Sequence, residues 1–222
     1  MAPSIESILK DSEFRPDLLE RIAQRKAQPP LEIVPSDPSW LADFEHFRSL
    51  IATALAADGP PSDTGTSPGG FVSVSHVGST SVPGLPAKAV IDIDLVVPSI
   101  GDEATYVPHL EAAGFHFVSR EPHWHGHRFF AAYGPPRWAN LHVWGPECPE
   151  VERHRIFRDY LLAHADERER YVAAKEQAMR ATKEGAGSMQ DYNWGKQEVI
   201  RGILRRAFQE LGYIKEDADE KK

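Results

Sequence analysis

The sequence has few of the features that mark secreted, membrane or nucleic-acid-binding proteins. Its 222 residues include one cysteine, Cys148, which excludes an intrachain disulfide framework and fits a reducing compartment. No stretch approaches the roughly 20 apolar residues of a membrane span, and no basic segment followed by an apolar run opens the sequence. We therefore expect a cytoplasmic protein without a membrane partner. The formal net charge of −8 argues against a broad basic surface for nucleic acid and leaves open only a local basic groove.

The composition is that of an ordinary globular domain. Hydrophobic residues make up 41% of the chain and charged residues 26%, which suffices for one sizeable core. Helically spaced apolar residues over 4–27, with an interruption at Pro16, predict an added N-terminal helix. We therefore expect an N-terminal helical extension (1–30), a main domain (31–213) and a disordered acidic tail (214–222).

The order of the expected elements predicts an α+β fold. We expect helices at 38–57, 102–113, 151–161, 167–182 and 191–211, and strands at 31–34, 71–77, 90–97, 115–119, 128–133 and 138–143. The first of these helices carries an apolar stripe from Trp40 to Leu55 that we expect to be buried in the core. Residues 58–70 are rich in Gly, Pro, Ser and Thr and predict a flexible surface loop. A block of strands with helices on either side of it in the sequence indicates a mixed sheet flanked by helices.

The most informative stretch is FVSVSHVGSTSVPGLPAKAVIDIDLVV, residues 71–97. Two β-branched runs flank a loop of small residues, which predicts strand, tight loop and strand. Because side chains alternate along a strand, Asp92 and Asp94 share one face, within about 7 Å of each other. Carboxylates on an apolar strand need a cation or a donor between them, so a divalent metal is a natural candidate. The alternative is a structural pair held by backbone N–H groups or by Arg128.

The loop before the second strand offers groups that hold an anion. Gly78, Ser79, Thr80 and Ser81 provide backbone N–H groups and hydroxyls, which is what a phosphate group needs.

This pattern resembles a known family. A Gly-Ser pair followed at a distance by Asp92-Ile93-Asp94 is similar to the signature of the DNA polymerase beta type nucleotidyltransferase superfamily. HVGSTSVPGLPAKAVIDIDLVV more closely resembles the hallmark of its GrpB (UPF0157-like) branch, as do LEIVPSDPSW, HRFF, NLHVW and FRDYLLAH. The likeness covers roughly 31–211 and implies a nucleotidyltransferase-like mixed sheet. It extends to fungal proteins related to arginine-containing cyclodipeptide synthases, so a fungal member is expected.

The resemblance also bears on the metal. In the superfamily a third carboxylate comes from a later strand, but here that strand offers Asn140 and His142, and the GrpB pattern likewise has histidine there. Asp92, Asp94 and His142 are therefore the expected metal ligands, with Mg²⁺ or Mn²⁺ as the ion and Zn²⁺ as a less favoured one. A His ligand weakens the case for ordinary nucleotidyl transfer and shifts the preference toward imidazole-tolerant ions.

Other histidines have two interpretations each. His123, His125 and His127 alternate and would bind Zn²⁺ on an extended strand, but Pro122 and Gly126 favour a solvent-facing turn. His76 is more simply a hydrogen-bonded core histidine than a catalytic base.

Three cations complete the candidate site. Lys88 follows the loop and is expected to reach a phosphate or carboxylate, which the family pattern favours. Arg128 is expected either to clamp an anionic group or to pair with one of the aspartates. Lys196 matches a family lysine and is expected either to contact a ligand or to be an ordinary exposed lysine.

Three functions follow as hypotheses. The first is a metal-dependent nucleotidyltransferase-like enzyme in which Asp92, Asp94, His142, Lys88 and Arg128 are catalytic, the acceptor being a small molecule. The second, implied by the resemblance, is an aminoacyl-tRNA-dependent cyclodipeptide synthase of secondary metabolism. Those enzymes depend on a DDxxE-type motif that this sequence lacks. The third is a non-catalytic binding or chaperone-like domain.

Overall fold

The computed structural model describes residues 2–12, 15–56 and 70–215. The loop expected at 58–70 lies outside the described residues except for Gly70, as does the acidic tail beyond residue 215. None of the described helices is long and apolar enough to cross a lipid bilayer.

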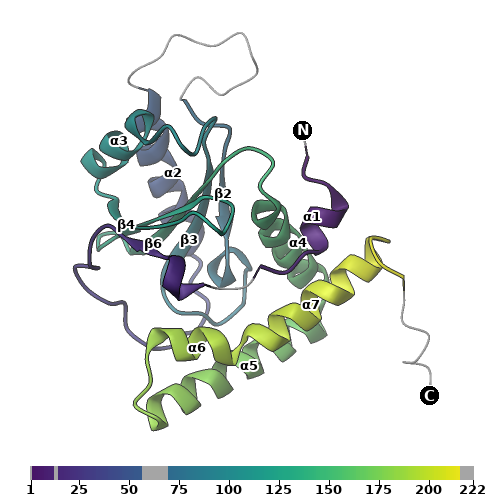
Figure 1. Cartoon of the computed structure of the whole chain (residues 1–222). Helices are drawn as coiled ribbons and strands as arrows, with labels where there is room; N and C mark the ends of the chain where they lie inside the picture. Colours follow the sequence, from purple (N-terminus) through teal and green to yellow (C-terminus); the bar gives the residue numbers. More distant parts are fainter. Residues whose placement is uncertain (1, 13–14, 57–69, 216–222) are drawn as a thin grey trace, which may run out of the picture.

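A six-stranded sheet in the order β1-β4-β5-β6-β3-β2 forms the centre of the fold (Figure 1). Its strands are β1 (Glu20–Arg21), β2 (Ser73–Val77), β3 (Val90–Val96), β4 (His116–Glu121), β5 (His127–Ala132) and β6 (Trp138–Trp144). β3 and β6 are parallel and all other neighbours are antiparallel. The predicted α+β fold with a mixed sheet is therefore confirmed.

One face of the sheet is apolar and packs against α2 (Trp40–Ala56) and α3 (Val107–Ala112), with the short 3₁₀ helix η3 (Glu103–Thr105) beside α3. The expected stripe on the first of these helices is buried, from Trp40 to Leu55. From β3 it meets Ile91, Ile93 and Leu95, all with no exposed surface. Strand alternation therefore places Asp92 and Asp94 on the opposite face.

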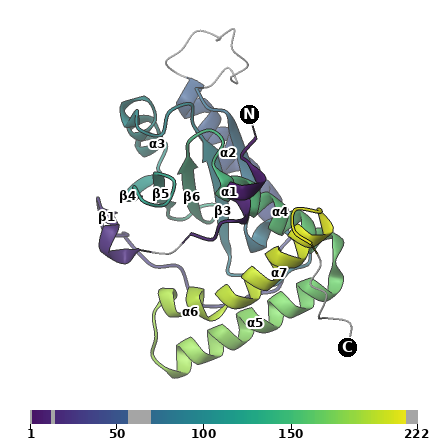
Figure 2. The same ribbon diagram turned by 45° about the vertical axis from the view of Figure 1, so that its right-hand side comes forward.

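That opposite face is covered by the C-terminal helices α4 (Pro149–Ala163), α5 (Ala165–Glu184), α6 (Met189–Gly195) and α7 (Gln197–Glu210) (Figures 1 and 2). The prediction of one helix over 191–211 is wrong, because α6 and α7 meet at Lys196 and run in different directions. A Cβ on Gly195 would lie 2.9 Å from the Cβ of Ala178, so this glycine lets α6 pack closely on α5.

The N-terminal prediction is also wrong, since residues 4–27 do not form one helix. The described part of this stretch contains a five-residue helix, α1 (Ile5–Leu9), a 3₁₀ turn at Pro16–Leu18, and β1, which pairs with β4 at the sheet edge. Proline lacks the N–H that a continuing helix needs, and the free edge of β4 supplies partners that satisfy the extended backbone. The strand expected at 31–34 is reduced to one bridge, Val34 to Ala87.

Candidate functional site

A cavity of about 460 Å³ lies where the polar face of the sheet meets the C-terminal helices. Its walls come from β3 and β6, from η2 (Ser79–Ser81, the 3₁₀ turn after β2), from α4 to α7, and from the N-terminal segment. The predicted residues that line it are Gly78, Ser79, Thr80, Lys88, Asp92, Asn140, His142 and Lys196. The sheet and the helix bundle thus bring together residues from four separate parts of the chain.

Asp92 is fixed against the small-residue turn. Its Oδ1 accepts a hydrogen bond from Asn140 Nδ2 at 2.7 Å, across the parallel pair β3·β6. On its other side lies Gly78, whose φ of +69° is unfavourable for any residue with a Cβ. A Cβ at this position would also collide with Asp92 Oδ2. Gly78 is therefore required both by the turn and by the close approach of the carboxylate.

Replacing Gly78 by alanine is expected to lower the free energy of unfolding by about 3 kcal/mol, since backbone strain and a collision add together. Gly84→Ala is the matched control, because Gly84 also has a positive φ (+81°) but a Cβ there meets nothing within 4 Å. Chemical denaturation of both variants measures the difference. Equal losses would show that the contact with Asp92 contributes nothing.

Asp94 is buried, with 1% of its surface exposed, and both its oxygens are hydrogen-bonded. Oδ1 accepts from Trp144 Nε1 at 2.9 Å and Oδ2 from His154 Nδ1 at 2.8 Å. Burial alone would raise the pKa of Asp94, but the charge and hydrogen bond of His154 outweigh it and lower the pKa. Burial likewise opposes protonation of His154, yet Asp94 raises its pKa to about 9. The two side chains therefore form a buried ion pair at neutral pH.

These contacts bear on the metal expected at Asp92, Asp94 and His142. Among the described residues, no group of three or more His, Cys, Asp and Glu side chains is placed to hold a metal ion. Because the Asp94 oxygens already accept protein donors, the three side chains as arranged do not fit a divalent ion. The metal stays a prediction that requires these side chains to rearrange.

His142 ends a chain of hydrogen bonds that starts at the sheet edge. Glu121 Oε1 lies 2.9 Å from His127 Nδ1, and His127 Nε2 lies 3.0 Å from His142 Nδ1. If the Glu121 carboxylate accepts the proton of His127 Nδ1, then His127 Nε2 accepts from His142 Nδ1. This arrangement leaves His142 Nε2 as an acceptor. Burial lowers the pKa of His142 to about 4, so the ring is neutral at pH 7.

Three lysines surround the cavity beside two tyrosine rings. Lys88 Nζ and Lys196 Nζ lie 4.7 and 4.8 Å from the ring centre of Tyr192, and Lys175 Nζ lies 5.1 Å from that of Tyr171. Within the described part of the chain, none of the three lysines forms an ion pair with a carboxylate.

Burial and mutual repulsion destabilise the protonated forms of Lys88 and Lys175. Burial lowers the pKa of Lys88 to about 8 and that of Lys175 to about 7, and the charge of Lys196 adds to both effects. Lys88 Nζ contacts Met189 Sδ at 2.7 Å, and Lys175 Nζ donates to the carbonyl of Pro86 at 2.5 Å. The cavity thus gathers three lysine amines that are not ion-paired, although the charge of Asp92 on the same wall acts on Lys88 and Lys175 and partly offsets the lowering of their pKa values.

Several predicted residues lie elsewhere or have internal partners. Arg128 neither lines the cavity nor pairs with an aspartate of β3, because its Nε donates to Glu103 Oε1 at 2.6 Å. Ser81 Oγ donates back to the carbonyl of Gly78. His76 is buried, hydrogen-bonded to Thr80 Oγ1 at 3.0 Å, and stacked on an aromatic ring, as expected of a core histidine.

The three alternating histidines do not share a face. His123 and His125 are exposed in a turn where His125 and Gly126 have positive φ, and only His127 enters β5 and is buried. The turn interrupts the strand alternation, so the zinc arrangement considered for them is not formed.

Lys175, His154 and Arg25 are among the residues of the cavity wall that were not predicted from the sequence. Lys175 follows Tyr171 and Ala174 on the buried stripe of α5, and that stripe was the one signal available for it. His154 and Arg25 carry no local signal, because their partners are 60 and 115 residues away.

The comparison with protein families identifies the family of this chain. The model of the family described as "GrpB protein" matches residues 30–206. The chain belongs to the GrpB family. The GrpB chain is 42% identical over 171 residues to UPF0157 protein BH1888 of Halalkalibacterium halodurans, covering 77% of this chain and 79% of that one. It is 37% identical over 172 residues to UPF0157 protein SCO7215 of Streptomyces coelicolor, covering 77% and 81%. The resemblance to GrpB proteins is therefore confirmed.

A solved structure and a longer protein are also similar to this GrpB chain. The crystal structure of the conserved protein GrpB from Enterococcus faecalis has a TM-score of 0.66, covers 82% of this chain and 99% of that one, and shows the same fold at 24% identity. The dephospho-CoA kinase of Mycolicibacterium paratuberculosis is 30% identical over 207 residues, covering 82% of this chain. The GrpB chain spans about half (47%) of that kinase's length.

Proposed function

We propose that the cavity binds a nucleotide or a closely related small molecule with several phosphate groups, and that the protein transfers its nucleotidyl group to a small acceptor. The observation that carries the proposal is the set of three ammonium groups, Lys88, Lys175 and Lys196, around one cavity. A polyanion would neutralise them and offset the burial and the mutual repulsion that lower the pKa values of Lys88 and Lys175.

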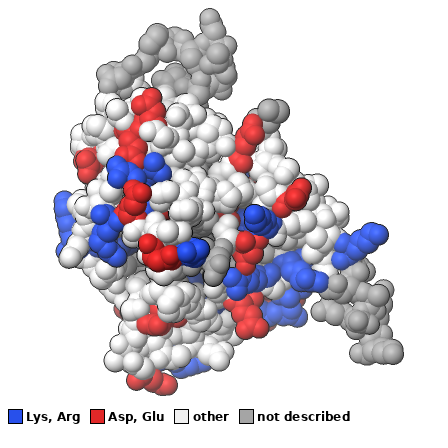
Figure 3. All heavy atoms as spheres, viewed as in Figure 1, with Lys and Arg blue, Asp and Glu red and all other residues white. Residues whose placement is uncertain are grey.

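The charge on the surface supports a small ligand over a nucleic acid. On the face in view, acidic and basic side chains are interspersed, and basic groups over α7 lie next to acidic ones (Figure 3). Nucleic acid binding relies on an uninterrupted basic surface. Lys88, Lys175 and Lys196 face a cavity instead.

The residues of the cavity support a transfer step without an assumed metal. A hydroxyl oxygen of the acceptor would attack the α-phosphorus, the new O–P bond would form, and the P–O bond to pyrophosphate would break. The hydroxyl proton would pass to Asp92, which lies on the cavity wall, and the lysines would stabilise the charge on the leaving pyrophosphate. A divalent ion, if side chains rearranged to hold one, would add further charge stabilisation.

Replacing Lys88 by alanine is expected to raise the dissociation constant for ATP at least about tenfold, because a charge-assisted contact with phosphate is lost. Isothermal titration with ATP, with EDTA and separately with Mn²⁺, measures this change. Lys183→Ala is the matched control, since Lys183 is exposed near the end of α5 and does not line the cavity.

Proton uptake provides a second test of the same site. Phosphate beside Lys88 and Lys175 raises their pKa values again, so ATP binding near pH 8 should take up protons from the buffer. Titrations in buffers of different ionisation enthalpy report the number of protons.

The reaction is tested separately by following pyrophosphate release from ATP in the presence of pooled small-molecule acceptors, with Asp92→Asn as the inactive variant. No binding of any nucleoside triphosphate, in EDTA or in Mn²⁺, would overturn the proposal. Binding of aminoacylated tRNA with release of a cyclic dipeptide would support the synthase hypothesis instead. A stable protein complex without ligand binding would support the non-catalytic one.

A further inference from the structure

The segment before the family match is a fixed part of this fold. β1 pairs with β4 in the register Glu20 to Arg120, and the amides of Ile22 and Ala23 both donate to the carbonyl of Val118, at 2.9 and 3.1 Å. The match to the GrpB family model begins only at residue 30. Backbone hydrogen bonds therefore hold this segment against the sheet at a defined position, and it reaches the cavity.

Arg25, at the inner side of this segment, lines the cavity. Its NH2 group donates to Asn140 Oδ1 at 3.0 Å, and its guanidinium carbon lies 4.7 Å from the ring centre of Phe129. The side chain is thus held at two points, by a hydrogen bond and by a cation–π contact.

The guanidinium of Arg25 retains most of its binding capacity. An arginine has five N–H donors, and this hydrogen bond occupies one of them. In the part of the chain that the structure describes, Arg25 has no carboxylate within ion-pair distance. Its charge acts on Lys88, whose pKa it helps to lower after burial and Lys196. Arg25 is therefore close enough to the lysines to act on the same bound anion.

We propose that Arg25 is a ligand-binding residue, so that a segment outside the family match supplies part of the site. This inference rests on the proposed function and specifies its ligand. The planar fork of arginine binds two oxygens of one phosphate, while lysines act as point charges. A chain of phosphates offers oxygens to the arginine and to all three lysines at once, so we expect the site to prefer nucleoside triphosphates over monophosphates.

Asn140 links Arg25 to the carboxylate of Asp92. It accepts from Arg25 through Oδ1 and donates to Asp92 through Nδ2. Arg25 therefore also helps to fix the amide orientation that holds the Asp92 carboxylate.

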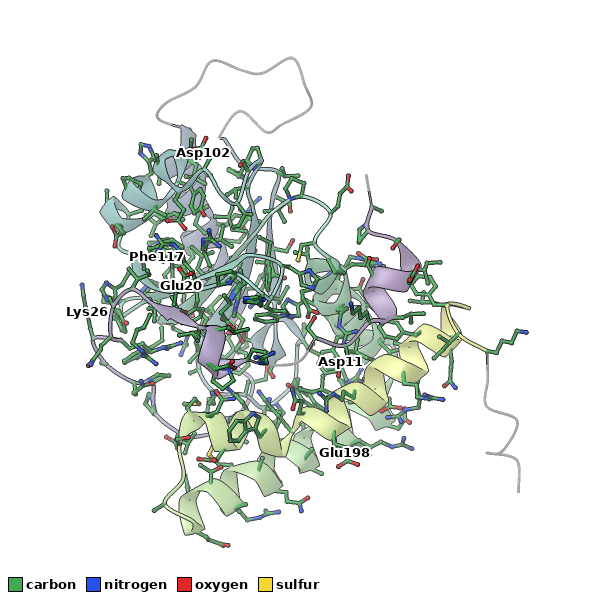
Figure 4. All side chains as sticks on the ribbon, in the orientation of Figure 1. Asp11, Glu20, Lys26, Asp102, Phe117 and Glu198 are labelled. Carbon is green, nitrogen blue, oxygen red and sulfur yellow. The ribbon has the colours of Figure 1, made fainter. Side chains whose placement is uncertain are left out.

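The test compares Arg25→Gln with Lys26→Gln in the full chain. Lys26 is the neighbouring residue, is exposed, and lies at the outer edge of the segment (Figure 4), so both variants lose one positive charge. Isothermal titration with ATP, AMP and inorganic pyrophosphate at several salt concentrations provides the readout. Arg25→Lys keeps the charge without the fork, and thermal unfolding checks that each variant folds.

We expect Arg25→Gln to weaken ATP binding at least about tenfold, to reduce the preference for ATP over AMP, and to flatten the salt dependence of the affinity. Arg25→Lys should recover part of the affinity, and Lys26→Gln should match the wild type. A structural role alone would leave the salt dependence unchanged.

Two failures are distinguishable. If the wild type binds ATP but Arg25→Gln binds it as tightly as Lys26→Gln does, this inference is overturned while the proposed function stands. If the wild type binds neither ATP nor pyrophosphate, the proposed function fails and this inference fails with it.

Discussion

Acidification from pH 6.5 to about 4 is expected to lower the free energy of unfolding strongly, because three histidines are buried in their neutral form. Burial lowers the pKa of His76 to about 4, of His127 to about 3 and of His142 to about 4, from 6.5. Below pH 6.5 the unfolded chain binds these protons and the folded chain does not, so each histidine removes about 1.4 kcal/mol of stability per pH unit. Glu121 acts in the opposite direction. Burial raises its pKa, so on acidification the folded chain takes up this one proton more readily than the unfolded chain does.

Three such terms over two pH units amount to about 8 kcal/mol, which exceeds the lower part of the usual range of total stability, about 5 to 15 kcal/mol. Urea unfolding at a series of pH values measures the slope. In His127→Gln the slope should decrease by about 1.4 kcal/mol per pH unit, because one proton fewer is taken up on unfolding. His123→Gln is the control, since His123 is exposed in the adjoining turn. A stability that stays constant down to about pH 5 would contradict the prediction.

Replacing Asp94 by asparagine is expected to lower the free energy of unfolding at about pH 6 by about 2 to 3 kcal/mol, because His154 loses its counter-charge. The value lies at the low end for buried pairs because 31% of the His154 side chain is exposed and regains hydration. The pKa of His154 should decrease from about 9, since burial lowers it and the largest opposing cause, the charge and hydrogen bond of Asp94, is lost while Glu150 and Asp92 still raise it. An NMR titration of the His154 ring measures this change.

The pH dependence of this loss has a defined sign. The raised pKa of His154 contributes stability that is complete below pH 6.5 and is lost as the pH rises through about 9. The lowered pKa of Asp94 contributes stability above pH 3.8 that is lost as the pH falls. The difference in unfolding free energy between wild type and Asp94→Asn should therefore be largest between pH 3.8 and pH 6.5 and shrink toward pH 9.

Asp102→Asn is the control for Asp94→Asn, because Asp102 is exposed at the start of η3. A difference between wild type and Asp94→Asn that stays the same from pH 6 to about 9 would mean that the charge of His154 plays no part.

Local patterns predicted much of the fold, because they depend on near neighbours. Alternation along β3 correctly separated Ile91 and Ile93 from the two aspartates, and the helical stripe from Trp40 to Leu55 is buried as expected. The same reasoning failed at residues 4–27. Helical spacing there is real over Ile5–Leu9, but the following chain pairs with a sheet edge formed about a hundred residues later.

Side-chain partners were less predictable than positions. Arg128 was expected to bind an anion or to pair with an aspartate of β3, yet it pairs with Glu103 of η3. The choice between Glu103 and the aspartates depends on where η3 packs, which no local pattern specifies.

The sequence by itself determined the family, the mixed sheet, and two carboxylates on one strand face beside a turn of small residues. Only the tertiary structure decided that Asp94 is neutralised by His154, and that lysines from three separate parts of the chain surround one cavity with Arg25. The physical reason is the sequence distance over which each effect acts. Backbone periodicity depends on adjacent residues, whereas charge pairing depends on groups that only folding brings together.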